Sequence, residues 1–192
     1  MITVDQQNLV FTLHTRRTTY QMKAGRHGVL FHTYYGPRIR GGDLSPLIQL
    51  ADRGFSPNPP EAGHDRTFSL DTLPQEYATS GAGDFRLPSI QAELADGSRI
   101  VDLRFCGYMV HQGKYALEGL PAFFAREDEA DTLTVYLADA VSGLRVELLY
   151  GVLEDCDLIT RAVRVVNGGE APFRLLQAAS LCLDFLRADL DL

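Results

Sequence analysis

Apolar and polar residues alternate with a period of two along most of the chain, and this period is typical of half-buried β-strands. The alternation is clearest at 132–137, where leucine or valine at every second position is separated by threonine or tyrosine. Helical periodicity is weak throughout. The pattern therefore predicts an all-β chain with strands at 8–14, 18–23, 29–35, 89–95, 99–110, 132–137, 144–153, 158–166 and 173–185.

Short turn segments separate several of these strands. The Asp-Gly-Ser segment at 96–98 predicts a hairpin between the strands on either side of it. Further turns are indicated at 141–143, 155–157 and 167–169. Adjacent antiparallel strands with short turns form meanders, and two facing sheets bury their apolar sides against each other. The predicted fold is an antiparallel β-sandwich.

One long segment interrupts this pattern without a regular period of its own. Residues 51–88 contain several prolines and glycines, so that neither a helix nor a strand can continue far. The segment is nevertheless rich in large apolar residues, which are rare in disordered chains. We expect an ordered loop held by these side chains: Phe55, Phe68, Leu70, Leu73, Tyr77, Phe85 and Leu87.

Composition restricts the partners and the compartment. The net charge of −7 over 192 residues makes nucleic acid or an anionic membrane surface a poor partner. No apolar run approaches the roughly 20 residues of a membrane span, and the first residues lack a signal-peptide pattern. Cys106, Cys156 and Cys182 are widely spaced, which predicts reduced, buried thiols in a cytoplasmic protein.

Metal and cofactor sites are not predicted. The five histidines show no zinc-ligand spacing, and the glycine-containing segment at 81–84 lacks the lysine and context of a phosphate loop. The absence of tryptophan weakens a stand-alone sugar-binding function, because sugars commonly stack on large aromatic faces.

The last predicted strand suggests that the sequence continues. Residues 173–185 are apolar on both faces, and only seven residues follow them. An exposed apolar edge strand promotes aggregation, so proteins usually cover it. We therefore expect residues 1–192 to be the front part of a longer polypeptide.

Five irregular motifs carry a family resemblance. They are ADRGFSPNP at 51–59, FSLDTLPQEYATSGAGDFRLP at 68–88, DGSRIVDLR at 96–104, LEGLPA at 117–122 and LEDCDLITRAVRVVN at 153–167. With these motifs the chain resembles the N-terminal β-sandwich domain of the family 36 glycoside hydrolases, the bacterial-type α-galactosidases that act on melibiose and raffinose. The likeness runs in order from residue 2 to about residue 184.

The resemblance implies a galactose-mutarotase-like super-sandwich, followed in the parent enzyme by a (β/α)8 barrel and a small C-terminal β domain. In that family, two barrel aspartates perform a retaining hydrolysis, which needs carboxyl groups about 5 Å apart. Neither barrel motif is present here, so residues 1–192 are expected to be an incomplete N-terminal part without catalytic residues. In the tetrameric members of that family the N-terminal domain helps to assemble the oligomer, and the resemblance implies a homotetrameric parent.

The resemblance also implies a role for Asp52 in recognising the galactoside, in a pocket formed by the barrel of a neighbouring subunit. A carboxylate accepts hydrogen bonds from two adjacent hydroxyls and can select the axial hydroxyl of galactose. Arg53, Phe55 and Asn58 lie in the same motif and are candidates to orient Asp52 or to line the entrance. From the residues alone, the alternative is that Asp52 caps a turn through nearby backbone amides.

A second polar cluster lies further along the same loop. Its members are Asp71, Gln75, Glu76, Asp84 and Arg86. The carboxylates allow an acid/base pair. Buried loops, however, must satisfy their own polar groups, which favours a structural role. We expect an ion pair, either Asp84 with Arg86 or Glu76 with an arginine, to hold the loop in place.

Two functions of different class follow. The first is a non-catalytic domain of an α-galactosidase that assembles the oligomer and contributes Asp52 to galactose recognition. The second is a self-contained β-sandwich that binds a carbohydrate or a protein.

Overall fold

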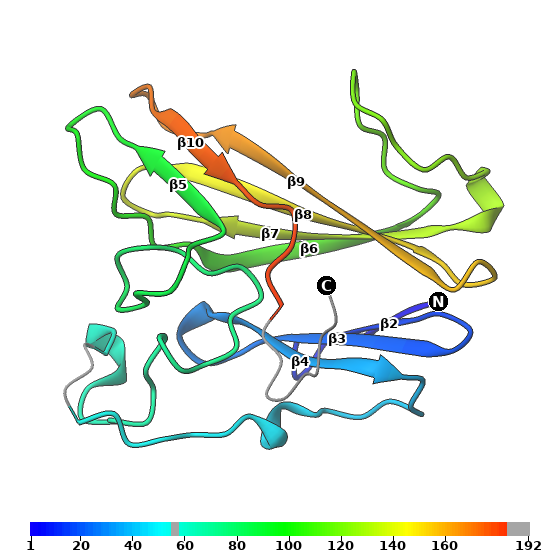
Figure 1. Ribbon diagram of the computed structural model, residues 1–192, viewed down its shortest axis with the longest axis horizontal. Helices are drawn as coiled ribbons and strands as arrows, with labels where there is room; N and C mark the ends of the chain where they lie inside the picture. Colours follow the sequence, from blue (N-terminus) through cyan, green and yellow to red (C-terminus); the bar gives the residue numbers. More distant parts are fainter. Residues whose placement is uncertain (55–57, 184–192) are drawn as a thin grey trace, which may run out of the picture.

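The computed structural model describes residues 1–54 and 58–183, and its strands form two facing layers (Figure 1). The first layer is a four-stranded antiparallel meander of β1 (Ile2–Asp5), β2 (Val10–His14), β3 (Thr18–Ala24) and β4 (Leu30–Pro37). The second is a longer meander of β6 (Arg104–Gln112), β7 (Asp131–Ala138), β8 (Leu144–Leu153) and β9 (Leu158–Asn167). A two-stranded sheet of β5 (Ile90–Glu93) and β10 (Arg174–Ala178) lies beside the second layer.

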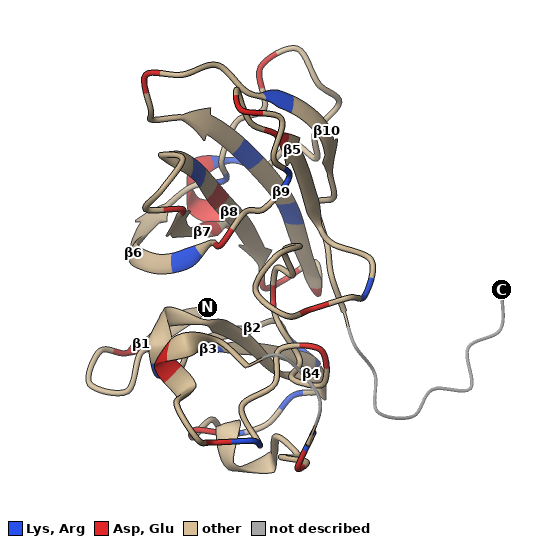
Figure 2. Ribbon diagram, turned by 90° about the vertical axis from the view of Figure 1, so that its left-hand side faces the viewer, with Lys and Arg blue, Asp and Glu red and all other residues tan. Residues whose placement is uncertain are grey.

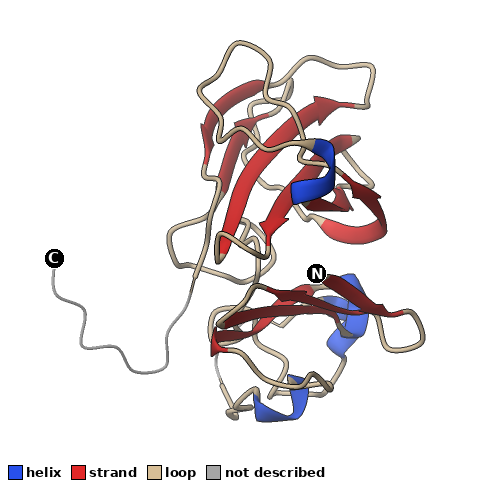
Figure 3. Ribbon diagram, turned by 90° about the vertical axis from the view of Figure 1, so that its right-hand side faces the viewer, coloured by secondary structure: helices blue, strands red, loops and turns tan. Residues whose placement is uncertain are grey.

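The all-β prediction is confirmed. Within the described residues, the helical elements are single 3-10 turns at Arg26–Gly28, Ser45–Leu47, Pro60–Ala62 and Glu127–Glu129 (Figure 3). None of the helices in the described part of the chain is long and apolar enough to span a membrane. The strands predicted at 144–153 and 158–166 coincide with β8 and β9 to within one residue.

The core lies between the two layers. Phe11 and Leu13 of β2 and Met22 of β3 are fully buried against side chains that β7 and β8 direct inward. Burial of such side chains stabilises a fold by roughly 1.5–3 kcal/mol each. The inward set of the second layer follows the period of two and consists of Leu133, Val135, Leu137, Val146, Leu148, Tyr150 and Val152.

The described residues of the irregular segment, 51–54 and 58–88, are ordered, as expected, and they cover the edge of the first layer. The bridge between Phe31 of β4 and Gln75 and two further backbone hydrogen bonds align residues 74–76 with this edge strand. Phe68, Leu70 and Leu73 form a second small core. The prediction that Phe85 and Leu87 help to hold the loop is wrong, because their side chains are 79% and 80% exposed. Phe55 lies outside the described residues.

Two strand predictions and one prediction about the cysteines are corrected by the structure. The turn at 96–98 forms, but β5 pairs with β10 instead of continuing into a hairpin with β6. Of the strand predicted at 173–185, the described residues form a strand only at Arg174–Ala178, which is β10. Residues 184–185 lie outside the described chain. Cys106 and Cys156 are free, as expected, but exposed rather than buried.

Asp157 connects the turns at one end of the two layers. Its carboxylate accepts hydrogen bonds from the Thr15 hydroxyl at 2.5 Å, the Arg17 amide at 3.0 Å and Arg17 Nε at 2.7 Å. These bonds, led by the one from Thr15, lower the pKa of Asp157 to about 2. The contact joins the β2–β3 turn to the β8–β9 turn.

Replacing Asp157 with Asn should lower the stability in a pH-dependent way. The pKa of Asp157 in the folded protein lies below its ordinary value. The contribution of this carboxylate to stability is therefore complete above about pH 4 and is lost as the pH falls toward 2. The thermal midpoint of D157N should therefore fall below that of the wild type at pH 7 and approach it at pH 3. Asn tolerates the positive φ of 55° at this position, which keeps the backbone comparable. Asp155→Asn is the matched control, since its side chain is almost fully exposed, and it should show no such difference.

Candidate functional site

The Asp52 segment carries an exposed carboxylate that lies in an ion pair. The Asp52 side chain is 60% exposed and its Oδ1 lies 2.9 Å from Nε of Arg66. The amide of Arg53 donates to the carbonyl of Arg66 at 3.1 Å, so the two stretches run side by side. The partner of Asp52 is thus a side chain from further along the loop, whereas the turn that Asp52 would cap in the alternative includes residues 55–57, which lie outside the described residues.

Arg53 and Asn58 both contact the protein itself. Arg53 Nη2 lies 3.1 Å from Oδ2 of the mostly buried Asp71. Asn58 donates from Nδ2 to the carbonyl of Asp65 at 2.8 Å. Both side chains therefore hold the loop. Phe55, the remaining candidate, lies in the part of the chain that is not described.

Sequence reasoning missed Arg66, although a signal was present. The Asp-Arg pair at 52–53 recurs at 65–66. In the structure Arg66 of the second pair binds Asp52 of the first, whereas Asp65 binds Arg26 at 2.9 Å. Figure 2 shows charged residues of both signs in the loops that lie beneath the first sheet.

Glu76 is the centre of the second cluster and is completely buried between the two layers. It receives hydrogen bonds from the hydroxyls of Tyr20 and Tyr150, each at 2.7 Å to Oε1. Arg161 Nη1 lies 2.7 Å from the same oxygen, and His32 Nδ1 lies 3.3 Å from Oε2. The expected ion pair between Glu76 and an arginine is confirmed. Its partners come from β3, β4, β8 and β9, so that this carboxylate joins both layers.

The charges in this cluster stabilise each other. Burial would raise the pKa of Glu76, but the opposing effects of Arg161, His32 and Tyr20 outweigh it and the pKa lies below its ordinary value. Burial likewise raises the pKa of Tyr20 and Tyr150, which stay neutral donors. A carboxylate whose neighbours hold it ionised and whose oxygens are occupied has no role left as an acid or a base.

Asp84 shows the same structural role. Its buried carboxylate accepts from Arg86 Nη2 at 2.8 Å and from Gln75 Nε2 at 2.7 Å. Arg86 also donates to the carbonyls of Leu70 and Leu73, each at 2.8 Å. The expected Asp84–Arg86 pair is therefore confirmed. Together with Asp71, which binds Arg53 and the Ser69 hydroxyl, these groups stabilise the loop.

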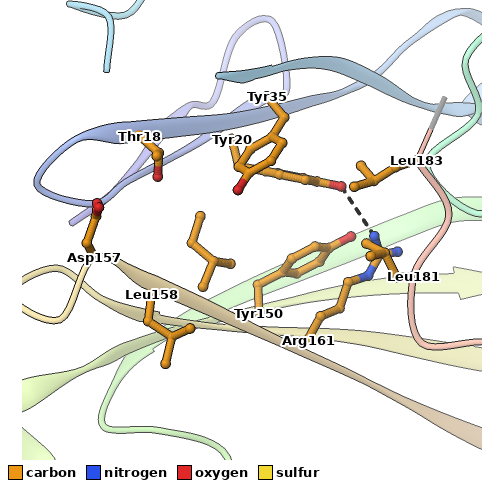
Figure 4. A pocket seen from close by; sticks show the side chains of 10 residues that line it. Thr18, Tyr20, Tyr35, Tyr150, Asp157, Leu158, Arg161, Leu181 and Leu183 are labelled. Carbon is orange, nitrogen blue, oxygen red and sulfur yellow. Dashed lines mark hydrogen bonds between the residues drawn. The ribbon is translucent and has the colours of Figure 1, made fainter. Parts of the chain in front are cut away.

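A cavity of about 220 Å³ opens between the layers beside the Glu76 cluster (Figure 4). Its walls are mostly apolar, with Leu158, Leu181 and Leu183 facing the tyrosines of the first layer. Two polar groups that border it have partners, since Arg161 Nη1 donates to the hydroxyl of Tyr20 at 3.2 Å and Asp157 binds Arg17, whereas the buried Nε of Arg161 has no hydrogen-bond partner among the described residues. No group of three or more potential metal ligands occurs in the described chain. The Asp52 segment is therefore the better candidate for ligand contact.

Comparisons with known proteins identify the relatives. Residues 28–192 match the glycosyl hydrolase family 36 N-terminal domain. The chain is 47% identical over 182 residues to the bifunctional alpha-galactosidase/sucrose kinase AgaSK of Mediterraneibacter gnavus, covering 95% of this chain and 19% of that protein. It is 41% identical over 191 residues to alpha-galactosidase AgaA of Geobacillus stearothermophilus, covering 99% of this chain and 26% of that protein.

Solved structures agree with the sequence relatives. The galactosidase domain of AgaSK superimposes with a TM-score of 0.93 at 46% identity, over 96% of this chain and 26% of that one. A variant of AgaA from Geobacillus stearothermophilus, solved in complex with raffinose, gives a TM-score of 0.88 at 42% identity, over 94% of this chain and 25% of that one. The chain thus spans about a fifth to a quarter of the length of these relatives. It belongs to the family of glycosyl hydrolase family 36 N-terminal domains.

Proposed function

We propose that residues 1–192 form the N-terminal, non-catalytic part of the super-sandwich of an α-galactosidase that hydrolyses terminal α-galactosides of the melibiose and raffinose type with retention. In this proposal the catalytic barrel lies in further chain, and this domain helps to assemble a homotetramer. The alpha-galactosidase relatives, one of them solved with raffinose, support the substrate class. The three free cysteines support a reducing, cytoplasmic location.

The Asp52 loop is proposed to contribute to galactose recognition in a neighbouring subunit. The observation that carries this step is the exposed carboxylate of Asp52, whose Oδ1 lies 2.9 Å from Nε of Arg66. The Asp52 side chain is 60% exposed, so that its carboxylate is accessible to sugar hydroxyls that donate hydrogen bonds. Hydrogen bonds to a charged acceptor contribute about 1.5–3 kcal/mol each.

The effect of Asp52→Ala on kinetics tests this proposal. In the longer polypeptide that the proposal implies, kcat/KM for a chromogenic α-galactoside should fall by about tenfold, which corresponds to roughly 1.4 kcal/mol. Stability should hardly change, because an exposed ion pair contributes about 0–1 kcal/mol. An unchanged kcat/KM would show that Asp52 does not contact the sugar.

The second candidate function is a self-contained binding module. The exposed Phe85 and Leu87 favour it, because large apolar side chains at a surface often mark a site of contact with another protein. Titration of the 192-residue chain with melibiose distinguishes the two functions. Measurable affinity of a monomer would support the module, whereas the α-galactosidase proposal predicts none without the barrel.

A further inference from the structure

Two large apolar side chains are exposed in the loop that Asp84 anchors. Phe85 and Leu87 are 79% and 80% exposed, whereas Asp84 is buried and Arg86 is half-buried. The exposure therefore alternates from residue to residue, as it does in a strand with one face on the protein and the other in water. Residues 84–87 belong to no strand, so side-chain contacts rather than sheet pairing produce this alternation.

The inward-facing residues fix the backbone around the exposed ones. Asp84 accepts hydrogen bonds from the backbone amide of Arg86 at 2.9 Å, from Nε of Arg86 at 3.0 Å and from Nε2 of Gln75 at 2.7 Å. Arg86 in turn donates to the carbonyls of Leu70 and Leu73. Residues 85 and 87 cannot turn inward without breaking these bonds, because they lie next to the anchored pair in the chain.

A third exposed apolar side chain lies near this loop. Ile100 is 62% exposed, and a Cβ atom at Gly81 would lie well inside van der Waals contact with Cγ2 of Ile100. Four residues span at most roughly 14 Å, so Ile100 lies within that reach of Phe85. Single exposed apolar residues are common on protein surfaces. Three within one short reach, two of them held outward, are typical of an interaction site.

The proposed function supplies a partner for this apolar patch, defined as Phe85, Leu87 and Ile100. This chain spans about a fifth to a quarter of the length of its relatives. Figure 1 shows the loops of residues 60–103, coloured cyan to green, at the end of the two layers opposite the β8–β9 turn. The patch therefore lies outside the core between the layers. A loop that is already held in one conformation loses little conformational freedom when a partner covers it.

We infer that the apolar patch is the surface against which the polypeptide following residue 192 packs an apolar face of its own. This inference rests on the proposed function, which assigns a catalytic barrel to that polypeptide. The Asp84–Arg86 pair then has two roles, since it holds the loop and presents Phe85 and Leu87 to the rest of the enzyme. A second copy of the chain, or a separate protein, would be a different occupant.

Hydroxyl-radical oxidation read by mass spectrometry tests whether the patch is covered. The oxidation rates of Phe85 and Leu87 are compared between the 192-residue chain and the longer polypeptide, with an added reporter peptide to equalise the radical dose. Both rates should be about fivefold lower in the longer polypeptide, because side chains at the centre of an interface are fully buried. Unchanged rates would overturn the inference.

Substitutions at Leu87 identify the occupant. Leu87→Asp should lower the thermal midpoint of the longer polypeptide by several degrees, because it places a charge in an apolar contact, and should leave that of the 192-residue chain unchanged. Leu87→Met keeps an apolar side chain of similar volume and should change neither midpoint. The native mass of the longer polypeptide should stay the same in both variants. An equal loss in both chains would show that the loop itself needs Leu87, and a lower native mass would show that a second copy covers the patch. Either result overturns the inference.

Activity separates this inference from the proposed function. If the longer polypeptide hydrolyses a chromogenic α-galactoside and Phe85 remains as exposed as in the 192-residue chain, the docking surface is wrong and the proposed function stands. If it does not hydrolyse the substrate, the proposed function fails. The oxidation rate of Phe85 then still decides whether the following polypeptide covers the patch.

Discussion

Glu76→Ala should destabilise the protein by about 3–5 kcal/mol, the cost of leaving a buried charge without its partner. The side chain of Arg161 is only 8% exposed and would lose its carboxylate, while the hydroxyls of Tyr20 and Tyr150 would lose their acceptor. The burial of these groups prevents water from replacing the lost contacts fully. Urea denaturation followed by circular dichroism measures this loss as a change in the free energy of unfolding.

Two controls define the effect of Glu76. Glu170→Ala removes an exposed carboxylate and should change the free energy of unfolding by less than about 0.5 kcal/mol. The folded pKa of Glu76 is depressed, so its contribution is present above the ordinary pKa and is lost as the pH falls through the folded value. The difference between wild type and Glu76→Ala should therefore be larger at pH 7 than at pH 3. An effect below 1 kcal/mol at pH 7 would show that the cluster does not join the layers.

Asp84→Ala should cost about 3 kcal/mol, at the upper end of what the loss of a charged hydrogen-bonding partner causes. The carboxylate is almost completely buried and binds both Arg86 and Gln75. Without it, Arg86 loses the contact that aligns it with the carbonyls of Leu70 and Leu73. The loss should be local as well as global, with faster amide hydrogen exchange in residues 69–88.

A double-mutant cycle separates the contribution of the Asp84–Arg86 interaction from the contribution of each residue alone. In a cycle with Arg86→Met, the double variant should lose clearly less than the sum of the two single losses, because removing both charges leaves no unpaired charge. Asp84→Asn keeps one acceptor oxygen and should lose less than Asp84→Ala. Equal hydrogen exchange in wild type and Asp84→Ala would contradict the anchoring role.

The strands that sequence could predict are those with local determinants. β8 and β9 are long runs rich in leucine, valine and isoleucine that are bounded by tight turns, and at one of these turns Gly143 approaches Gly169 so closely that a Cβ would lie 2.8 Å away. The partner of β5 could not be predicted. Its turn has hairpin chemistry, yet the strand pairs with β10 from a distant part of the chain, and local turn residues do not determine such long-range pairing.

The candidate site was predictable in part for the same reason. The roles of Glu76 and Asp84 follow from the general need of buried carboxylates for partners. The identity of Arg161, far along the chain on β9, could come only from the arrangement of the two layers. The exposure of Phe85 and Leu87 was also hidden, because a segment without periodicity does not indicate which of its apolar residues face inward.

Hydrolysis of a chromogenic α-galactoside, measured on a sample whose intact mass is determined in parallel, tests the central claim most directly. We expect no turnover at a mass of 21.3 kDa, because the carboxylates of Glu76 and Asp84 are occupied by structural partners and because the proposed function assigns the catalytic pair to a separate barrel. Turnover by a sample of that mass would contradict the account, since the catalytic carboxylates would then have to lie within these 192 residues.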